Sequence, residues 1–219
     1  MTNMKNSILI YSGGLDSTVL LYKYSEQIKL AISFNYGSKH NDREFHFAKI
    51  NTDKLGIEHI RIDLPFVNSF FKSSLLSSGG DIPEGHYEDE SMRSTVVPFR
   101  NGIMLSIAAG IAESVGADTV MIANHMGDHA IYPDCRDTFI HKMSQAIEEG
   151  TYKGIKLEAP FTLITKRQIA IIGKDLGVDF NNTYSCYKGE YQHCGKCGTC
   201  VERIEALEGF DTTTYTGHG

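Results

Sequence analysis

The sequence predicts an α/β protein whose parallel sheet is covered by helices on both faces. Short apolar runs alternate along the chain with longer stretches of helical periodicity, which is the pattern of such a sheet. The composition, 41% hydrophobic and 22% charged, is that of an ordinary globular protein. A length of 219 residues suits one domain with a sizeable core.

Five apolar runs are predicted to be strands. The first, residues 7–11, reads SILIY and the second, residues 30–34, reads LAISF, so both should be buried. The third alternates apolar and polar residues (HIRIDL), which favours a position nearer an edge of the sheet. In chain order the third, fourth and fifth strands are predicted at residues 59–64, 119–123 and 157–160.

Helical periodicity predicts six helices, at residues 16–24, 41–55, 101–115, 137–149, 165–176 and 201–207. The third of these is apolar almost all round, so it should be deeply buried. The fifth begins with the capping-box pattern of Thr165 and Gln168 and ends before Gly177. Residues 73–96 lack periodicity and are rich in Ser, Gly and acids. We expect a mobile surface loop there, either a plain insertion or a lid over a site.

The charge and the beginning of the chain argue against two kinds of partner. The 21 basic and 27 acidic side chains give a formal charge of -6, which leaves no broad basic surface for nucleic acid. The run MTNMKNSILIYSGG holds too few apolar side chains for a signal peptide or a membrane span. We therefore expect a cytoplasmic protein that binds neither nucleic acid nor membrane.

The turn between the first predicted strand and the first predicted helix has the features of a phosphate-binding loop. Gly13 and Gly14 allow the backbone to turn sharply and to approach a ligand closely. The free amides at the helix start then face an anion, together with the hydroxyl groups of Ser12, Ser17 and Thr18. A Gly-Gly turn into a helix also occurs for structural reasons alone, so the spacing leaves both interpretations open.

Asp16 is the unusual member of this loop. A carboxylate repels a polyphosphate unless a divalent cation lies between them, so we assign Asp16 a role with Mg²⁺. The loop matches neither GxxxxGK[ST], because no Lys follows, nor GxGxxG. The run SGGLDS resembles instead the SGGxDS pyrophosphate loop of the ATP pyrophosphatase family.

That resemblance implies a five-stranded parallel sheet of adenine-nucleotide α-hydrolase type, with adenine near the ends of the first two strands. Tyr36 follows the second strand, where an adenine contact should lie, although ordinary loop packing would explain it equally well. By the resemblance Asp16 and Ser12 are the catalytic residues. The residues expected to contact ATP are Tyr11, Ser12, Gly13, Gly14, Leu15, Asp16, Ser17, Thr18 and Tyr36.

Four of the five cysteines crowd into one short segment near the C-terminus, which indicates a metal site. They are Cys186, Cys194, Cys197 and Cys200, and the last three have C-x₂-C-x₂-C spacing. In a reducing compartment such a cluster suggests a metal before disulfides. Four thiolates are what a closed tetrahedral Zn²⁺ site requires, with no position open for catalysis. We predict one structural Zn²⁺ per chain.

Alternatives remain open at the cysteine segment. An iron-sulfur cluster also takes four cysteines, and His193 could replace one of them as a ligand. Gly195 and Gly198 should permit the tight turns that aim the sulfurs at one centre. We predict an ATP-binding α/β domain over residues 1–180, with a zinc-binding segment and tail over residues 181–219 packed on the same domain.

Two further polar motifs are candidates for substrate contacts. Arg100 and Asn101 lead into the buried helix, where Arg100 could clamp a carboxylate or phosphate, or form a salt bridge to an acid. The motif YPDCR follows the fourth strand, at the carboxyl end where open α/β sheets bind ligands. There Tyr132 can stack on a heterocycle, Asp134 can accept from an N–H edge and Arg136 can hold a carboxylate.

SGGLDS, VPFRN, YPDCR and the cysteine spacing, in this order, resemble the 7-cyano-7-deazaguanine synthase family of the queuosine pathway over residues 8–207. The resemblance implies a carbon-nitrogen ligase that uses Mg²⁺ and ATP to convert 7-carboxy-7-deazaguanine and ammonia to the nitrile. The reaction would pass through an adenylated acid and then the amide. A homodimer with one Zn²⁺ per chain and small-molecule substrates is also implied.

The chain departs from the family pattern at three places. Ser38 stands where the family has Gln, Phe99 where it has Gly, and Ala130 and Ile131 where it has Ser-Gly. These positions lie at the expected edges of the pocket, so they bear on the identity of the acceptor.

Two other functions would use some of the same motifs. A tRNA-modifying ligase or sulfur transferase shares the loop, but it would need a basic surface or an added domain, and sulfur transfer needs a reactive cysteine. Cys135 is the one candidate, and a single small buried Cys is usually inert. A zinc-stabilised binding module could instead keep the nucleotide loop as a sensor. Carboxylate-dependent exchange between ATP and pyrophosphate separates an enzyme from such a module.

Overall fold

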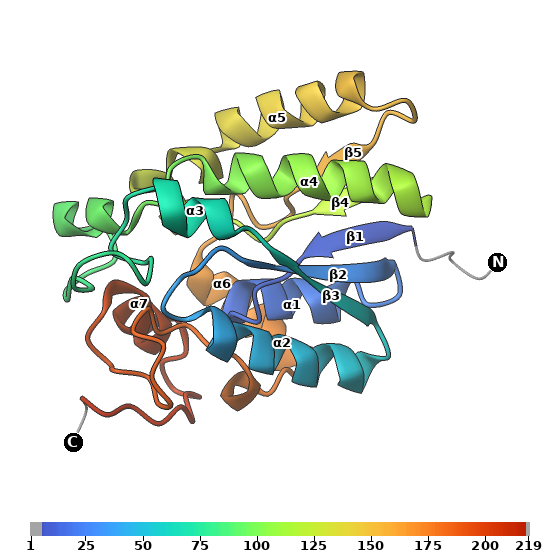
Figure 1. The fold of residues 1–219 in the computed structure, drawn as a ribbon. Coiled ribbons are helices and arrows are strands. Elements are labelled where there is room, and N and C mark those ends of the chain that lie inside the picture. Colours follow the sequence, from blue (N-terminus) through green and yellow to red (C-terminus); the bar gives the residue numbers. More distant parts are fainter. Residues whose placement is uncertain (1–5, 218–219) are drawn as a thin grey trace.

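A five-stranded sheet lies at the centre of the molecule, between two layers of helices (Figure 1). The computed structural model describes residues 6–217. Its strands are β1 (Ser7–Ile10), β2 (Ile28–Asn35), β3 (Glu58–Asp63), β4 (Thr119–Met121) and β5 (Lys156–Glu158). All neighbours pair in parallel, in the order β3-β2-β1-β4-β5. The predicted parallel five-stranded sheet is confirmed, with the third strand at an edge.

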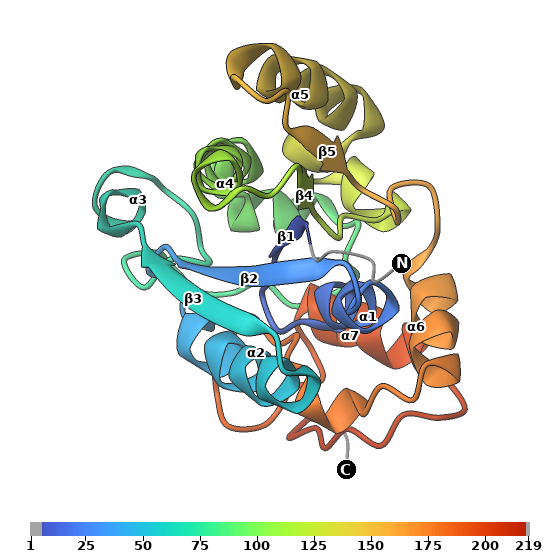
Figure 2. The same cartoon turned by 90° about the vertical axis from the view of Figure 1, so that its right-hand side faces the viewer.

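Helices cover both faces of the sheet, as the alternation of elements predicted (Figure 2). One face carries α4 (Arg100–Val115) and α5 (Asp137–Gly150); the other carries α1 (Leu15–Lys23), α2 (Asn41–Leu55), α6 (Lys166–Asp175) and α7 (Gly198–Ala206). Successive strand residues point to opposite faces, so Ile8 joins one hydrophobic core and Leu9 the other, both with no exposed surface. The strands are therefore apolar throughout because each face is buried.

The buried apolar helix and the capped helix both form as expected. The stretch Glu90–Val115, which includes α4, is long and apolar enough by length and composition to cross a membrane. Half of its apolar 18-residue window is buried, and α4 packs against β1 and β4, which makes it a core helix. The hydroxyl of Thr165 accepts from the Gln168 amide at 3.2 Å, and the Gln168 side chain accepts from the Thr165 amide at 2.8 Å. This confirms the predicted capping box of α6.

The connection after β3 differs from the prediction. A short helix, α3 (Pro65–Phe70), was not expected, because six residues are too few to show a helical period. Residues 73–96 were predicted to be a mobile surface loop, yet Leu75 and Leu76 have no exposed surface. Isolated apolar side chains carry no periodicity, so the sequence did not reveal this packing.

The C-terminal segment lies against the α/β body rather than apart from it. Helix α7 packs against α6, and Cys197 forms an isolated β-bridge with Glu84. Arg203 of α7 is completely buried, and its guanidinium donates to the Thr183 hydroxyl at 2.8 Å and to the Phe180 carbonyl at 2.6 Å. These contacts agree with a segment packed on the main domain, while a boundary at residue 180 stays a prediction.

Candidate active site

A cavity of about 220 Å³ opens at the carboxyl ends of the central strands. Its walls include Tyr11 and Ser12 directly after β1, Tyr36 after β2 and Asn124 near the end of β4. The strand order reverses between β1 and β4, and an open α/β sheet forms its ligand crevice at such a point. The pocket therefore lies where the fold itself leaves a gap.

The glycine loop turns from β1 into α1 at the floor of this pocket. Gly13 has φ +85°, and a Cβ there would come within 2.3 Å of the Glu44 carbonyl oxygen, so only glycine fits. The Ser12 hydroxyl accepts the Gly14 amide hydrogen at 3.1 Å and lies 3.0 Å from the Ser17 hydroxyl. No side chain caps the first turn of α1. Its free amides and two hydroxyl groups thus face the pocket together.

The loop residues predicted to contact ATP divide into two groups. Six of them line the pocket: Tyr11, Ser12, Gly14, Leu15, Asp16 and Ser17. Gly13 and Thr18 do not; Thr18 has no exposed surface, and its hydroxyl bonds to that of Tyr11 at 3.1 Å. Thr18 therefore supports the loop from behind, where its helical position places its side chain in the core.

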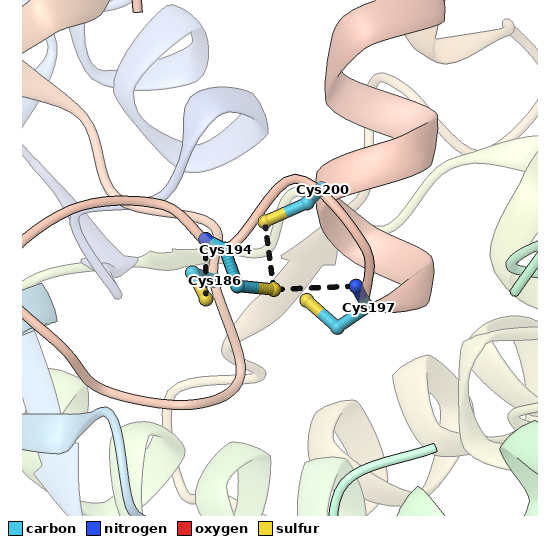
Figure 3. Close-up of side chains that lie close together, drawn as sticks. All are labelled: Cys186, Cys194, Cys197 and Cys200. Carbon is cyan, nitrogen blue, oxygen red and sulfur yellow. Dashed lines mark hydrogen bonds between the residues drawn. The ribbon is translucent and has the colours of Figure 1, made fainter. Parts of the chain in front are cut away.

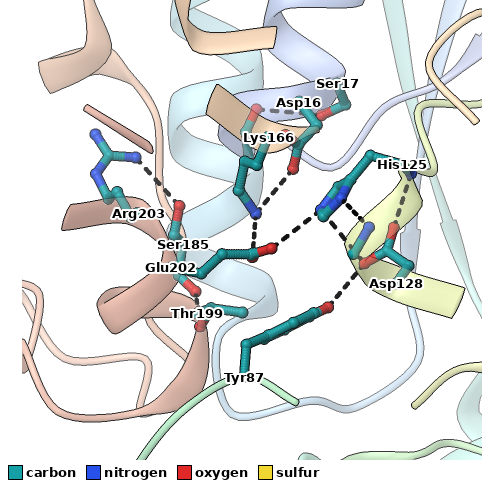
Figure 4. A network of polar contacts seen from close by, with 12 residues as sticks. Asp16, Ser17, Tyr87, His125, Asp128, Lys166, Ser185, Thr199, Glu202 and Arg203 are labelled. Atoms are coloured by element: carbon teal, nitrogen blue, oxygen red, sulfur yellow. Dashed lines mark hydrogen bonds and ion pairs between the residues drawn. The ribbon is translucent and has the colours of Figure 1, made fainter. Parts of the chain in front are cut away.

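Asp16 belongs to a buried network of charges, shown in Figure 4. Its Oδ2 lies 3.1 Å from the ammonium of Lys166, which also donates to Glu202 at 2.8 Å. Burial alone would lower the pKa of Lys166, but Asp16 and Glu202 outweigh it and raise that pKa above its ordinary value. The other oxygen of Asp16, Oδ1, is buried and has no hydrogen-bond partner. It is an oxygen of the kind that Mg²⁺ takes.

The network continues to His125 and Asp128. His125 Nδ1 accepts the Gly127 amide hydrogen at 3.0 Å, and its Nε2 faces Asp128 and Glu202 at 3.5 Å each. Asp128 also accepts from the Tyr87 hydroxyl at 2.8 Å. Burial would raise the pKa of Asp128, but His125, Lys166 and these hydrogen bonds lower it overall, so the carboxylate stays charged.

Sequence reasoning missed this network. One signal was present: Lys166 and Arg167 begin a helix, where the helix dipole favours anions over cations. A cation at that position needs another reason, and here the reason is the acids that Lys166 faces. Glu202 and Lys166 lie far along the chain from His125 and Asp128, so no local pattern could join these two pairs.

The opposite wall carries Arg100, from the start of α4. Its guanidinium donates to the Tyr36 hydroxyl at 3.2 Å and lies over the Tyr36 ring. Within residues 6–217 no carboxylate oxygen approaches it within 4.0 Å, so the salt bridge that was the alternative for Arg100 is not formed there. Asn101 and Tyr132 line the same pocket. Arg100 is thus a cation in the pocket that forms no ion pair within 4.0 Å in the described residues.

Asp134 and Arg136 do not line the pocket. The Asp134 carboxylate accepts the backbone amide of Asn101 at 2.8 Å and so stabilises the first turn of α4. Arg136 is exposed and donates to the His129 carbonyl. Cys135 does line the pocket, but burial above all raises the pKa of its thiol well above the ordinary value, which leaves it protonated.

The departures from the family pattern also lie outside the lining of the pocket. None of Ser38, Phe99, Ala130 and Ile131 is among the residues that form its walls. Phe99 is instead the residue before α4, with φ +53°, the left-handed conformation that glycine favours. The departures therefore affect the residues around the pocket more than the side chains that line it.

The four cysteines expected to bind metal come together, as Figure 3 shows. All four are buried, and their sulfur atoms lie within 4.8 Å of one another, with Cys194 and Cys200 at 3.9 Å. Tetrahedral Zn²⁺ with bonds of 2.3 Å would place its sulfurs about 3.8 Å apart, so the set fits this metal closely. The backbone amides of Lys196 and Cys197 point at the Cys194 sulfur, which favours a thiolate.

The residues between the cysteines have separate roles. Gly195 has φ +71°, as expected for a tight turn. Gly198 has no positive φ; it is closely packed instead, since a Cβ there would lie 3.0 Å from the Met92 sulfur and 3.1 Å from the Tyr87 Cα. His193 is outside the cluster, since its Nε2 accepts the Ser185 amide at 3.1 Å and its ring packs on Tyr184. Four sulfurs complete the set without it.

A parallel sheet with an uncapped glycine turn at its switch point defines a class of α/β proteins that binds phosphorylated ligands. A solved structure of NMN synthetase from Francisella tularensis shares this fold, with a TM-score of 0.50 and 16% identity over 86% of this chain and 69% of that one. Residues 6–211 match the family of queuosine biosynthesis protein QueC, and the chain belongs to that family.

Curated relatives agree over nearly the full length. The 7-cyano-7-deazaguanine synthase of Porphyromonas gingivalis is 56% identical over 99% of this chain and 100% of that protein. The synthase of that name from Desulfotalea psychrophila is 51% identical, over 97% of this chain and 99% of that protein. The whole of the α/β body and the cysteine segment is thus shared with these relatives.

Proposed function

We propose that the chain is a 7-cyano-7-deazaguanine synthase of queuosine biosynthesis. It is an ATP-dependent ligase that converts 7-carboxy-7-deazaguanine and ammonia to 7-cyano-7-deazaguanine. The family membership and the relatives of this name support the proposal. The observation that supports it at the site is that the uncapped start of α1 and Arg100, which forms no close ion pair in the described residues, lie in one pocket. The reaction brings together two anions, a triphosphate and a carboxylate, and these two features can bind anions.

The first half of the reaction activates the acid. The substrate carboxylate attacks the α-phosphorus of ATP, the bond to the β-phosphate oxygen breaks, and pyrophosphate leaves with the electron pair. In our proposal the first-turn amides of α1 and the Ser12 and Ser17 hydroxyls hold the phosphate oxygens. Arg100 holds the carboxylate, and the Tyr36 ring beneath it restricts where the guanidinium can lie. Ammonia then displaces AMP and gives the amide.

The second half converts the amide to the nitrile at the same site. The amide oxygen attacks a second ATP and releases pyrophosphate, and loss of AMP with the two protons of the amide nitrogen leaves the carbon-nitrogen triple bond. Both halves transfer AMP to an oxygen on the same carbon, so one set of phosphate contacts serves both. No residue in the pocket has to form a covalent bond, which agrees with the inert thiol of Cys135.

Asp16 would hold Mg²⁺ through its free Oδ1, where the ion would neutralise charge on the phosphates. The four buried cysteines would hold one structural Zn²⁺; an iron-sulfur cluster is the alternative, and elemental analysis for zinc and iron distinguishes the two. We also propose a cytoplasmic homodimer that acts on the free base before any nucleic acid is involved. The net charge of -6 supports that order of events.

The test is the identity of the product. Purified protein with 7-carboxy-7-deazaguanine, ammonium and Mg-ATP should form the nitrile, identified by mass spectrometry, with two molecules of AMP for each nitrile. Exchange of labelled pyrophosphate into ATP should depend on the acid. The exchange is measured at saturating Mg-ATP with a fully metal-loaded protein. If no exchange occurs under these conditions, the synthase function is excluded and a nucleotide-binding module is the remaining interpretation.

A further inference from the structure

Helix α7 joins the cysteine cluster to the ATP loop. Cys197 is the residue before the helix, Cys200 lies in its first turn, and Glu202 follows two residues later. The side chain of Glu202 points toward Lys166 (Figure 4). The positions of the sulfur ligands therefore fix where the Glu202 carboxylate lies.

Lys166 stands between two acids. Its ammonium makes a hydrogen bond of 2.8 Å to Glu202, while Asp16 Oδ2 lies somewhat farther away, at 3.1 Å. The side chains of Lys166, Glu202 and Asp16 are only 9%, 14% and 18% exposed. A buried ammonium needs an anion, because burial without one costs several kcal/mol. Within the described part of the chain, these two carboxylates are its ion-pair partners.

We propose that Glu202 is a positioning residue that shares Lys166 with Asp16 and thereby couples the ATP loop to the metal-binding cysteines. When Glu202 carries most of the interaction with Lys166, the Asp16 carboxylate keeps its negative charge available to a cation on ATP. Without Glu202 the ammonium turns fully to Asp16 and competes with that cation. Affinity for Mg-ATP then depends on the order of α7, and hence on the metal, although the cysteines lie outside the pocket walls.

The test compares Glu202→Gln with Glu205→Gln, a matched change on the same helix. Glu205 is 59% exposed, and its one ion-pair partner among residues 6–217 is His86, at 3.7 Å. Calorimetry should show Mg-ATP binding weakened on the order of tenfold in Glu202→Gln, the effect of losing one charged hydrogen bond, and unchanged in Glu205→Gln. Metal content per chain and the melting temperature are measured in parallel, and both variants should retain the metal.

A double-mutant cycle separates positioning from general support of the fold. In a Lys166→Met background, Glu202→Gln should cause no further loss of ATP affinity, since its effect passes through the lysine. A further tenfold loss there would overturn the proposal. If Lys166→Met does not fold, Lys166→Gln serves the same purpose.

The metal supplies an independent arm of the test. Chelation should weaken Mg-ATP binding in the wild type, and much less in Glu202→Gln, which has already lost the coupling. Equal ATP affinity of Glu202→Gln and wild type, or loss of metal from Glu202→Gln, would contradict the inference. The inference rests on the ATP site of the proposed function, and the two fail differently: if the wild type binds no Mg-ATP, the proposed function fails.

Discussion

Phe99 is held in a backbone conformation that suits glycine. Its φ of +53° makes it the one non-glycine residue with positive φ in residues 6–217, directly before Arg100. Its ring packs edge-on against Phe139 and covers Gly102, where a Cβ would meet the ring at 2.4 Å. The ring contacts hold the residue there although the left-handed conformation costs about 1 kcal/mol or more. Arg100, the first residue of α4, thus directly follows a residue with a strained backbone.

Replacement of Phe99 tests this account. In most positions an alanine is more stable than a glycine, but here Phe99→Gly should be more stable than Phe99→Ala by about 1 kcal/mol, because both lose the ring and only alanine keeps the strain. Urea unfolding of the two variants measures the difference. The usual order, with alanine more stable, would show that φ at this position carries no strain.

Glu44 and His40 give opposite pH dependences to stability. Burial raises the pKa of Glu44 from 4.5 to about 8, only partly offset by Arg100. Burial, with the charge of Arg100, lowers the pKa of His40 from 6.5 to about 3. Between pH 4.5 and about 8, Glu44 is therefore protonated in the folded protein and ionised in the unfolded chain. Between pH of about 3 and 6.5, His40 is neutral in the folded protein and protonated in the unfolded chain.

The expected profiles follow from those signs. Glu44 opposes folding more strongly as the pH rises from 4.5 to 8, so the stability of Glu44→Gln relative to wild type should increase over that range. His40 opposes folding as the pH falls from 6.5 to 3, so His40→Gln should gain on the acid side. One proton changes the free energy of unfolding by at most about 1.4 kcal/mol per pH unit. Urea unfolding across this pH range measures both, with the exposed Glu26→Gln as the flat control; a flat Glu44→Gln difference would contradict the assignment.

At the scale of elements, the C-terminal segment depends on its metal more than on a core of its own. Between α6 and the end of the described chain there is one regular helix of nine residues, α7. The two anchors of that helix are the cysteine cluster and the buried Arg203, whose donors reach Thr183, Ser185 and Phe180. The segment also shares a hydrophobic core with the α/β body through Ala206 and Leu207, so the cysteine cluster and the Arg203 contacts add to that packing.

Removing one sulfur should therefore remove the metal and loosen the whole segment. Cys200→Ser is expected to hold less than one Zn²⁺ per chain and to melt roughly 10 °C lower, as the loss of about 3 to 5 kcal/mol implies for a chain of this size. Cys135→Ser makes the same chemical change outside the cluster and should keep the metal. Elemental analysis and thermal melting report the two results. Full zinc content in Cys200→Ser would show that its sulfur is no ligand.

At the scale of the molecule, the sequence could predict the features that residues close together in the chain form by themselves. The SGGLDS turn, the C-x₂-C-x₂-C spacing and the Thr165 cap each depend on neighbours a few residues apart, and each forms as expected. The Asp134 carboxylate was expected in the pocket because Asp134 follows β4. It accepts instead the backbone amide hydrogen of Asn101 in α4, more than thirty residues earlier in the chain. Contacts of that range are set by how helices pack, and no periodicity records them.

The charge network is the strongest example of such long-range assembly, and it predicts how the molecule tolerates the loss of its central acid. Asp16→Ala should abolish nitrile formation, with a fall on the order of a hundredfold or more in turnover, because Asp16 carries a buried carboxylate oxygen with no hydrogen-bond partner beside the phosphate-binding turn. The fold should persist, since Lys166 keeps Glu202 as its partner at 2.8 Å.

Turnover assayed by mass spectrometry, together with thermal melting, tests both halves of that expectation. Asp53→Ala is the matched control, because Asp53 lies 63% exposed on α2 and, within the described residues, forms an ion pair with Lys49 alone. Normal turnover in Asp16→Ala would remove Asp16 from the mechanism. A melting temperature as low as that of the zinc-free protein would mean instead that Glu202 alone does not stabilise the buried ammonium of Lys166. Both carboxylates would then be needed for the stability of the fold.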